Sequence, residues 1–173
     1  MIRVYHVLHT FWMLNLLEDN ITELFDLVIK SKSLIITIGN TYRSDDGIGP
    51  YIFDNLNNIP GNIDCINAGD NPENVIDEAV KINPDITLII DAANFGGVPG
   101  EIRIIPSEFI PETTLSTHTF PPKIIAKILE EDTKSKIYFL GIQPASFDFN
   151  EGLSGEVKKT AEKIIDYFNN SIS

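Results

Sequence analysis

Short, fully apolar runs rich in β-branched residues alternate with amphipathic segments along most of this chain. The clearest runs are Leu34–Ile38, Ile86–Ile90 and Ile137–Ile142. A strand without polar alternation is typical of a sheet that is covered on both faces. Alternation of strands with helices favours parallel pairing. The pattern therefore predicts a single α/β domain of three layers, in which a mostly parallel, twisted sheet of about five strands has helices on both faces.

Two further strands and four helices complete this prediction. The strands are Asn62–Asn67 and Glu101–Ile105, and the helices are Pro50–Asn57, Pro72–Ile82, Pro122–Glu131 and Leu153–Phe168. Proline suits the first turn of a helix, where its missing N–H is not needed. The loop between Ile86–Ile90 and Glu101–Ile105 is too short for a crossover helix, so we expect these two strands to form an antiparallel pair.

Residues 1–33 are predicted to be an N-terminal helical extension, followed by the α/β domain over residues 34–173. Apolar residues recur at helical spacing between Val4 and Leu17 and again between Ile21 and Ile29. The first of these stretches is too short to span a membrane and is not followed by the small-residue cleavage site of a signal peptide. We therefore expect a cytoplasmic protein.

Charge and cysteine content narrow the function classes. The net charge of −12 repels phosphate backbones and so disfavours nucleic acid as a partner. Cys65 is the only cysteine, so no internal disulfide can form, which fits a reducing cytoplasm. Because Cys65 lies within a predicted apolar strand, we expect a buried core residue rather than a nucleophilic thiolate.

Acidic and imidazole side chains follow the predicted strands. Asp45 and Asp46 lie in the glycine-rich loop after Leu34–Ile38, Asp91 ends the run Ile86–Ile90, and His118 lies in a later loop. The carboxyl ends of parallel strands meet at one edge of a sheet, where ligands bind. We therefore expect Asp46 and Asp91 to converge in one crevice, with His118 available to complete a metal-binding or acid–base cluster. Taken singly, each residue has a simpler interpretation as a turn, cap or hydrogen-bonding residue.

The chemistry of the first loop argues against a nucleotide site. It lacks the Gly-Lys-Ser/Thr and Gly-x-Gly-x-x-Gly patterns, and Asp45 and Asp46 would repel phosphate. Gly47 and Gly49 instead indicate a tight turn close to a ligand or a partner backbone. Two carboxylates with one imidazole suit zinc, nickel, cobalt or iron better than calcium.

Five blocks of the sequence occur in the order found in one known family. They are Gly39-Asn40-x-x-x-x-Asp45-Asp46-Gly47-x-Gly49, the Asp91 strand end, Pro99-Gly100-Glu101-Ile102-Arg103, Thr117-His118 and Leu140-Gly141-Ile142-Gln143-Pro144. In these blocks the chain resembles the [NiFe]-hydrogenase maturation endopeptidases, and within them the branch that processes formate-hydrogenlyase-type large subunits. The resemblance covers roughly residues 34–168.

The resemblance implies an aspartic-type endopeptidase that removes the C-terminal extension of a [NiFe]-hydrogenase large-subunit precursor after nickel has been inserted. It assigns nickel sensing to Asp46, Asp91 and His118, with the nickel carried by the precursor. Asp45, Asp46 and Asp91 are the candidate catalytic residues. One position departs from the family pattern, because Asn67 stands where members often carry an aspartate.

Two other functions stay open at this point. One is a non-catalytic nickel-binding chaperone or adapter for hydrogenase assembly, and the other is a metal-dependent hydrolase of a small molecule. A deep, closed pocket around Asp91 would favour the small-molecule hydrolase, whereas a shallow cleft would favour a protein substrate. The sequence does not separate a metal that senses loading from a metal that takes part in catalysis.

Overall fold

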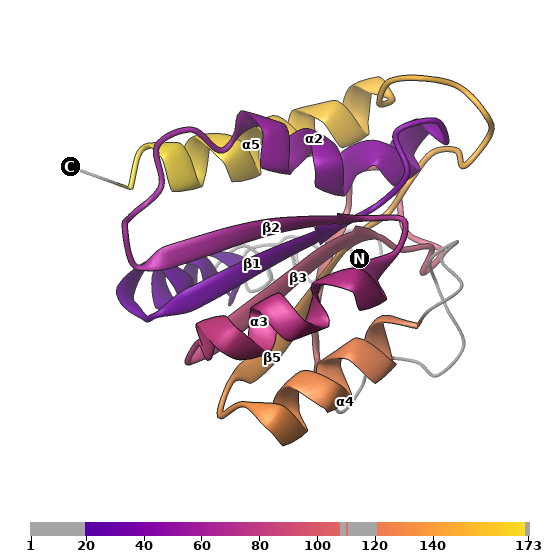
Figure 1. The fold of residues 1–173 in the computed structure, drawn as a ribbon. Coiled ribbons are helices and arrows are strands. Elements are labelled where there is room, and N and C mark those ends of the chain that lie inside the picture. The colour runs from indigo at the N-terminus through magenta and orange to yellow at the C-terminus, as the bar shows by residue number, and fades with distance from the viewer. Residues whose placement is uncertain (1–19, 108–109, 111–120, 172–173) are drawn as a thin grey trace, which may run out of the picture.

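A computed structural model describes residues 20–107, 110 and 121–171 of the chain. Its centre is one five-stranded sheet between two layers of helices (Figure 1). The strands are β1 Ser33–Ile38, β2 Ile63–Gly69, β3 Ile86–Ala92, β4 Ile102–Pro106 and β5 Lys136–Ile142. The helices are α2 Ile48–Asn55, α3 Ile76–Ile82, α4 Pro122–Asp132 and α5 Gly155–Asn169, and residues 20–30 are also helical. Two 3-10 turns, η1 Ser44–Gly47 and η2 Pro72–Val75, lead into α2 and α3.

The strand order is β2-β1-β3-β5-β4, with four parallel strands and β4 antiparallel at one edge. This confirms the predicted mixed sheet, but the predicted neighbour of β4 is wrong. β4 pairs with β5, not with β3, because β5 lies between them. Every residue of β3 is buried. The long apolar strand β5 is therefore a better partner than β4 for the side of β3 that does not pair with β1. β4 is only partly buried, which suits the edge of a sheet.

Helices cover both faces of the sheet, as predicted. In Figure 1 α2 and α5 lie along one face and α3 and α4 along the other. The first face has a core that joins Ile35, Leu88 and Leu140 of the sheet to Phe168 of α5. The second face has a separate core built on the alternate strand residues, among them Leu34 and Ile89. Because successive side chains of a strand point to opposite faces, an uninterrupted apolar run supplies both cores.

The helix of residues 20–30 packs on the same core as α5. Leu24, Phe25 and Val28 are buried, and the ring centroids of Phe25 and Phe168 lie 4.9 Å apart. The predicted boundary between an extension and a domain at residue 33 stays a prediction. Within residues 20–107, 110 and 121–171, no helix is long and apolar enough to cross a bilayer.

Candidate active site

Two glycines let the first loop fold back onto the end of β1. Gly39 has φ +148°, and a Cβ atom at this position would overlap the carbonyl oxygen of Asp46. A Cβ atom on Gly49 would overlap the carbonyl oxygen of Ile38. The backbone that Gly49 approaches is therefore the chain's own strand. The glycines of the motif bring η1 and the start of α2 into direct contact with the carboxyl end of β1.

Asp45 is fully buried and ties this loop to the segment before α5. Its carboxylate accepts the backbone N–H groups of Ala145, Ser146 and Ser154 at 2.7, 3.2 and 2.6 Å. It also accepts the hydroxyl of Ser154 at 3.0 Å. A carboxylate can accept about four hydrogen bonds, and Asp45 accepts four. A hydrogen bond to a charged group is stronger than one between two neutral groups. Asp45 thus joins two loops that are separated by about a hundred residues of sequence.

Asp46 and Asp91 lie at the same edge of the sheet, and both are fully buried. Asp46 belongs to η1, which packs against β3, and its backbone carbonyl accepts the N–H of Asn40 at 3.2 Å. Asp91 is the next-to-last residue of β3, one position beyond Ile90, which pairs with Thr37 near the end of β1. Two buried carboxylates on adjoining elements are candidates for acid–base or cation-binding chemistry.

His118, the third predicted member of this cluster, lies outside the described residues. Among the residues that the structure does describe, no three His, Cys, Asp or Glu side chains gather closely enough to hold a metal ion. The metal-binding role of Asp46 and Asp91 together with His118 therefore stays a prediction.

Gln143 of the last motif organises the loop that follows Asp91. The side-chain oxygen of Gln143 accepts the N–H groups of Phe95 and Gly97 at 2.9 and 3.1 Å. Its amide nitrogen donates to the side chain of Asn94 at 3.2 Å. Gln143 is 6% exposed, so these bonds form in a largely dry environment where they are strengthened. The glutamine was not among the predicted site residues, since its partners are about 50 residues away in sequence.

Asn67 supports an irregularity in β2 at the same edge. The pairing of β1 with β2 shifts after Thr37 and Asn67, so that Ile38 pairs with Gly69. The side-chain oxygen of Asn67 accepts the N–H of Gly69 at 3.0 Å and the hydroxyl of Thr37 at 3.4 Å. Both bonds need only an acceptor, which an aspartate would supply equally well. The departure from the family pattern is therefore compatible with this local structure.

The single thiol is not activated. Burial raises the pKa of Cys65 to about 12, so it stays protonated near neutral pH. The side chain is partly buried on edge strand β2, rather than fully buried as expected from the sequence. This raised pKa disfavours a thiolate nucleophile at this position.

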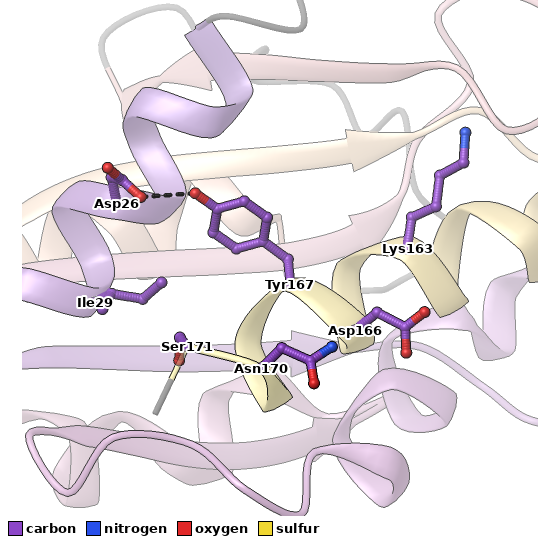
Figure 2. Close-up of a pocket in the computed structure, with 7 residues that line it drawn as sticks. All are labelled: Asp26, Ile29, Lys163, Asp166, Tyr167, Asn170 and Ser171. Atoms are coloured by element: carbon purple, nitrogen blue, oxygen red, sulfur yellow. Dashed lines mark hydrogen bonds between the residues drawn. The ribbon is translucent and has the colours of Figure 1, made fainter. Parts of the chain in front are cut away.

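Two surface hollows lie away from the carboxylates. The first, of about 610 Å³, lies between the helix of residues 20–30 and the end of α5 (Figure 2). There the hydroxyl of Tyr167 donates to Asp26 at 2.7 Å, and Lys163 extends away from this pair. The second, of about 530 Å³, lies between that helix and β4. Neither hollow is lined by Asp45, Asp46 or Asp91, so neither is the closed pocket that a small-molecule hydrolase would need around these residues.

Comparison with known proteins identifies the family of this fold and motif set. A family model described as hydrogenase maturation protease matches residues 51–170. The hydrogenase 3 maturation protease of Escherichia coli strain K12 is 35% identical over 133 residues, covering 76% of this chain and 85% of that protein. The chain belongs to the hydrogenase maturation protease family, and it is therefore a hydrolase of the peptidase class.

Solved structures agree with the fold. A crystal structure of a [NiFe] hydrogenase maturation protease, HycI, from Thermococcus kodakarensis KOD1 superposes with a TM-score of 0.75 at 29% identity. The superposition covers 86% of this chain and 97% of that one. The solution structure of an endopeptidase HycI from Escherichia coli gives a TM-score of 0.70 at 32% identity, covering 79% and 88% of the two chains.

Proposed function

We propose that this protein removes the C-terminal extension of a [NiFe]-hydrogenase large-subunit precursor in the cytoplasm, after nickel has been inserted. The observation that carries the proposal is the pair of fully buried carboxylates, Asp46 and Asp91, at the carboxyl edge of the sheet. Membership of the hydrogenase maturation protease family supports the reaction type and the class of substrate.

The nickel is cargo of the substrate. Carboxylate and imidazole donors suit divalent nickel, and in this proposal Asp46, Asp91 and His118 hold the precursor through its metal. A precursor without nickel brings no cation for these carboxylates to bind, so it gains less free energy when it docks. Selection for loaded precursor follows from that difference in free energy.

The hydrolytic step needs a base and a positioned loop. We assign the base to Asp46, which takes a proton from a water molecule as the water oxygen attacks the scissile carbonyl carbon. The C–N bond then breaks, and the proton passes to the leaving amine. Asp45 is the less suitable base, because its four hydrogen bonds already engage the carboxylate. Asp45 therefore acts as a positioning residue.

The test is cleavage of a purified large-subunit precursor, with and without nickel, followed by mass spectrometry. We expect loss of a C-terminal peptide from the nickel-loaded precursor alone. Asp46→Asn should stop cleavage, while Asp64→Asn, an exposed acid on β2, should leave the rate unchanged. Cleavage of both forms at equal rates would contradict the nickel requirement. Stable binding without cleavage would replace the protease by an adapter.

A further inference from the structure

Two loops at the active-site edge present exposed aromatic side chains. Tyr42 is 66% exposed and Phe149 is 81% exposed, whereas most large apolar side chains of the described chain lie in the core. Tyr42 precedes η1 by two residues, and Phe149 lies in the segment between β5 and α5. Both are therefore close in sequence to groups that build the active-site edge.

The backbones that carry these side chains are joined to each other. Arg43 and Asn150 form a parallel β-bridge. The N–H of Asn150 donates to the carbonyl of Tyr42 at 3.1 Å, and the N–H of Ser44 donates to the carbonyl of Asn150 at 2.7 Å. Ser44 also donates from its hydroxyl to the carbonyl of Asp148 at 3.1 Å. The two aromatic residues thus extend from one fixed framework, which lowers the entropy lost when a partner covers them.

Arg43 completes this surface. Its guanidinium carbon lies 4.9 Å from the ring centroid of Phe149, a cation–π contact that orients the ring. Arg43 is the only Lys or Arg between residues 33 and 80, and no Lys or Arg occurs between residues 137 and 157. A single arginine between exposed aromatic residues has the composition of a protein–protein hot spot.

We propose that Tyr42, Arg43 and Phe149, here called the aromatic corner, are the docking surface for the folded body of the large-subunit precursor. This inference rests on the proposed function and adds where the precursor is held. The reason for this occupant is continuity, because Arg43 leads directly into Ser44, Asp45 and Asp46. Asp45 also fastens the segment that carries Phe149 to η1. When the folded body of the precursor rests on the aromatic corner, the C-terminal segment that leaves this body lies next to η1, which carries Asp46.

The experiment compares binding and turnover of the nickel-loaded precursor by wild type and variants. The double variant Tyr42→Ser/Phe149→Ser should raise Kd and KM by roughly 30-fold, as expected for the loss of two hot-spot side chains, and should leave kcat within about twofold. Two single variants are also compared. Phe149→Leu keeps an apolar side chain, so it should bind the precursor with much of the affinity that Phe149→Ser loses. Leu27→Ser is the matched control, since Leu27 is an exposed apolar residue on the helix of residues 20–30.

The outcomes separate the inference from the proposed function. Unchanged Kd and KM in the double variant, with normal cleavage by wild type, would overturn the aromatic corner alone. Wild type that binds without cleaving, with binding lost in the double variant, would leave the aromatic corner standing and remove the protease. An equal loss in Leu27→Ser would also overturn the inference, because the effect would then not be specific to this surface.

Discussion

Two regions of the molecule carry carboxylates in opposite settings. At the carboxyl edge, Asp46 and Asp91 are fully buried, and two glycines with the Asp45 bonds hold the loop around them. At the other end of α5, Asp26 lines an open hollow and accepts the hydroxyl of Tyr167 (Figure 2). Asp26 is partly exposed and also forms an ion pair with Lys30. In the proposed function, the reactive region is the one with buried acidic groups and not the one with a hollow.

The largest expected effect is a difference in processing rate between variants in the two regions. Asp91→Asn should lower the rate of precursor processing by at least about 100-fold, because the neutral amide cannot replace a carboxylate toward a cation or a proton. Asp26→Asn should leave the rate within about twofold. Both rates would be measured on the same nickel-loaded precursor, with circular dichroism to verify folding. Equal losses of processing rate in the two variants would show that the region of Asp91 and the region of Asp26 do not differ in function.

The close approach of Gly49 to β1 predicts a large effect on stability. Gly49→Ala should lower the free energy of unfolding by about 3 kcal/mol, because the added methyl group overlaps the carbonyl of Ile38. Gly61→Ala is the matched control, since a Cβ atom there would meet no atom within 4 Å. Urea unfolding of both variants gives the comparison. A Gly49→Ala variant as stable as Gly61→Ala would show that the loop does not depend on this contact.

The Asp45 bonds predict a loss of both stability and activity. Asp45→Ala should cost about 3 kcal/mol, because three buried or partly buried N–H groups lose their acceptor. If Asp45 only positions the loop, kcat measured on the folded fraction should keep its wild-type pH profile. If the pH profile of kcat in Asp45→Asn differs from that of wild type, the base is instead Asp45.

The pair of Asp26 and Tyr167 should have the smallest effect. Burial first, and the hydrogen bond to Asp26 second, raise the pKa of Tyr167 to about 12. Hydrogen bonds from Lys30 and then Tyr167 lower the pKa of Asp26 below 3.8. The raised pKa of Tyr167 contributes its full stabilisation at pH values below 10.0, the pKa of an unperturbed tyrosine. The lowered pKa of Asp26 contributes its full stabilisation at pH values above 3.8, the pKa of an unperturbed aspartate.

Tyr167→Phe should therefore lower Tm by about 2 °C, with the same difference at every pH from about 5 to 9. Thermal unfolding across that range measures it. A difference that changes within this window would show that another titrating group is coupled to the pair.

Much of the fold follows from local sequence. The strands predicted at Leu34–Ile38 and Ile137–Ile142 are each extended by one residue in β1 and β5, since uninterrupted apolar runs have few other stable environments. Three helix starts differ, because Pro72 opens a 3-10 turn, Pro50 is the third residue of α2, and α5 begins at Gly155 rather than Leu153. Terminal turns of helices depend on caps and tertiary contacts, which a local pattern does not include.

The edge at which Asp46 and Asp91 lie could be predicted, but the hydrogen bonds that Asp45 accepts could not. Asp45 and Asp46 are adjacent and chemically identical in sequence, and only the fold brings Ala145 and Ser154 to the first of them. The neighbour of β4 was missed for a related reason, because strand order is set by which edge best buries β5. Contacts between distant segments are the information that local patterns lack.

The position of β4 outside β5 determines the order in which the sheet can be completed. As the chain leaves the ribosome, β4 is synthesised before β5, yet β5 is its only partner in the sheet among the described residues. Residues 102–106 must therefore wait until residues 136–142 have added to β3. During that interval one side of β3, a mainly apolar strand, has no pairing partner, and an unpaired apolar strand edge is prone to aggregation. A nascent protease is thus most vulnerable just before β5 emerges.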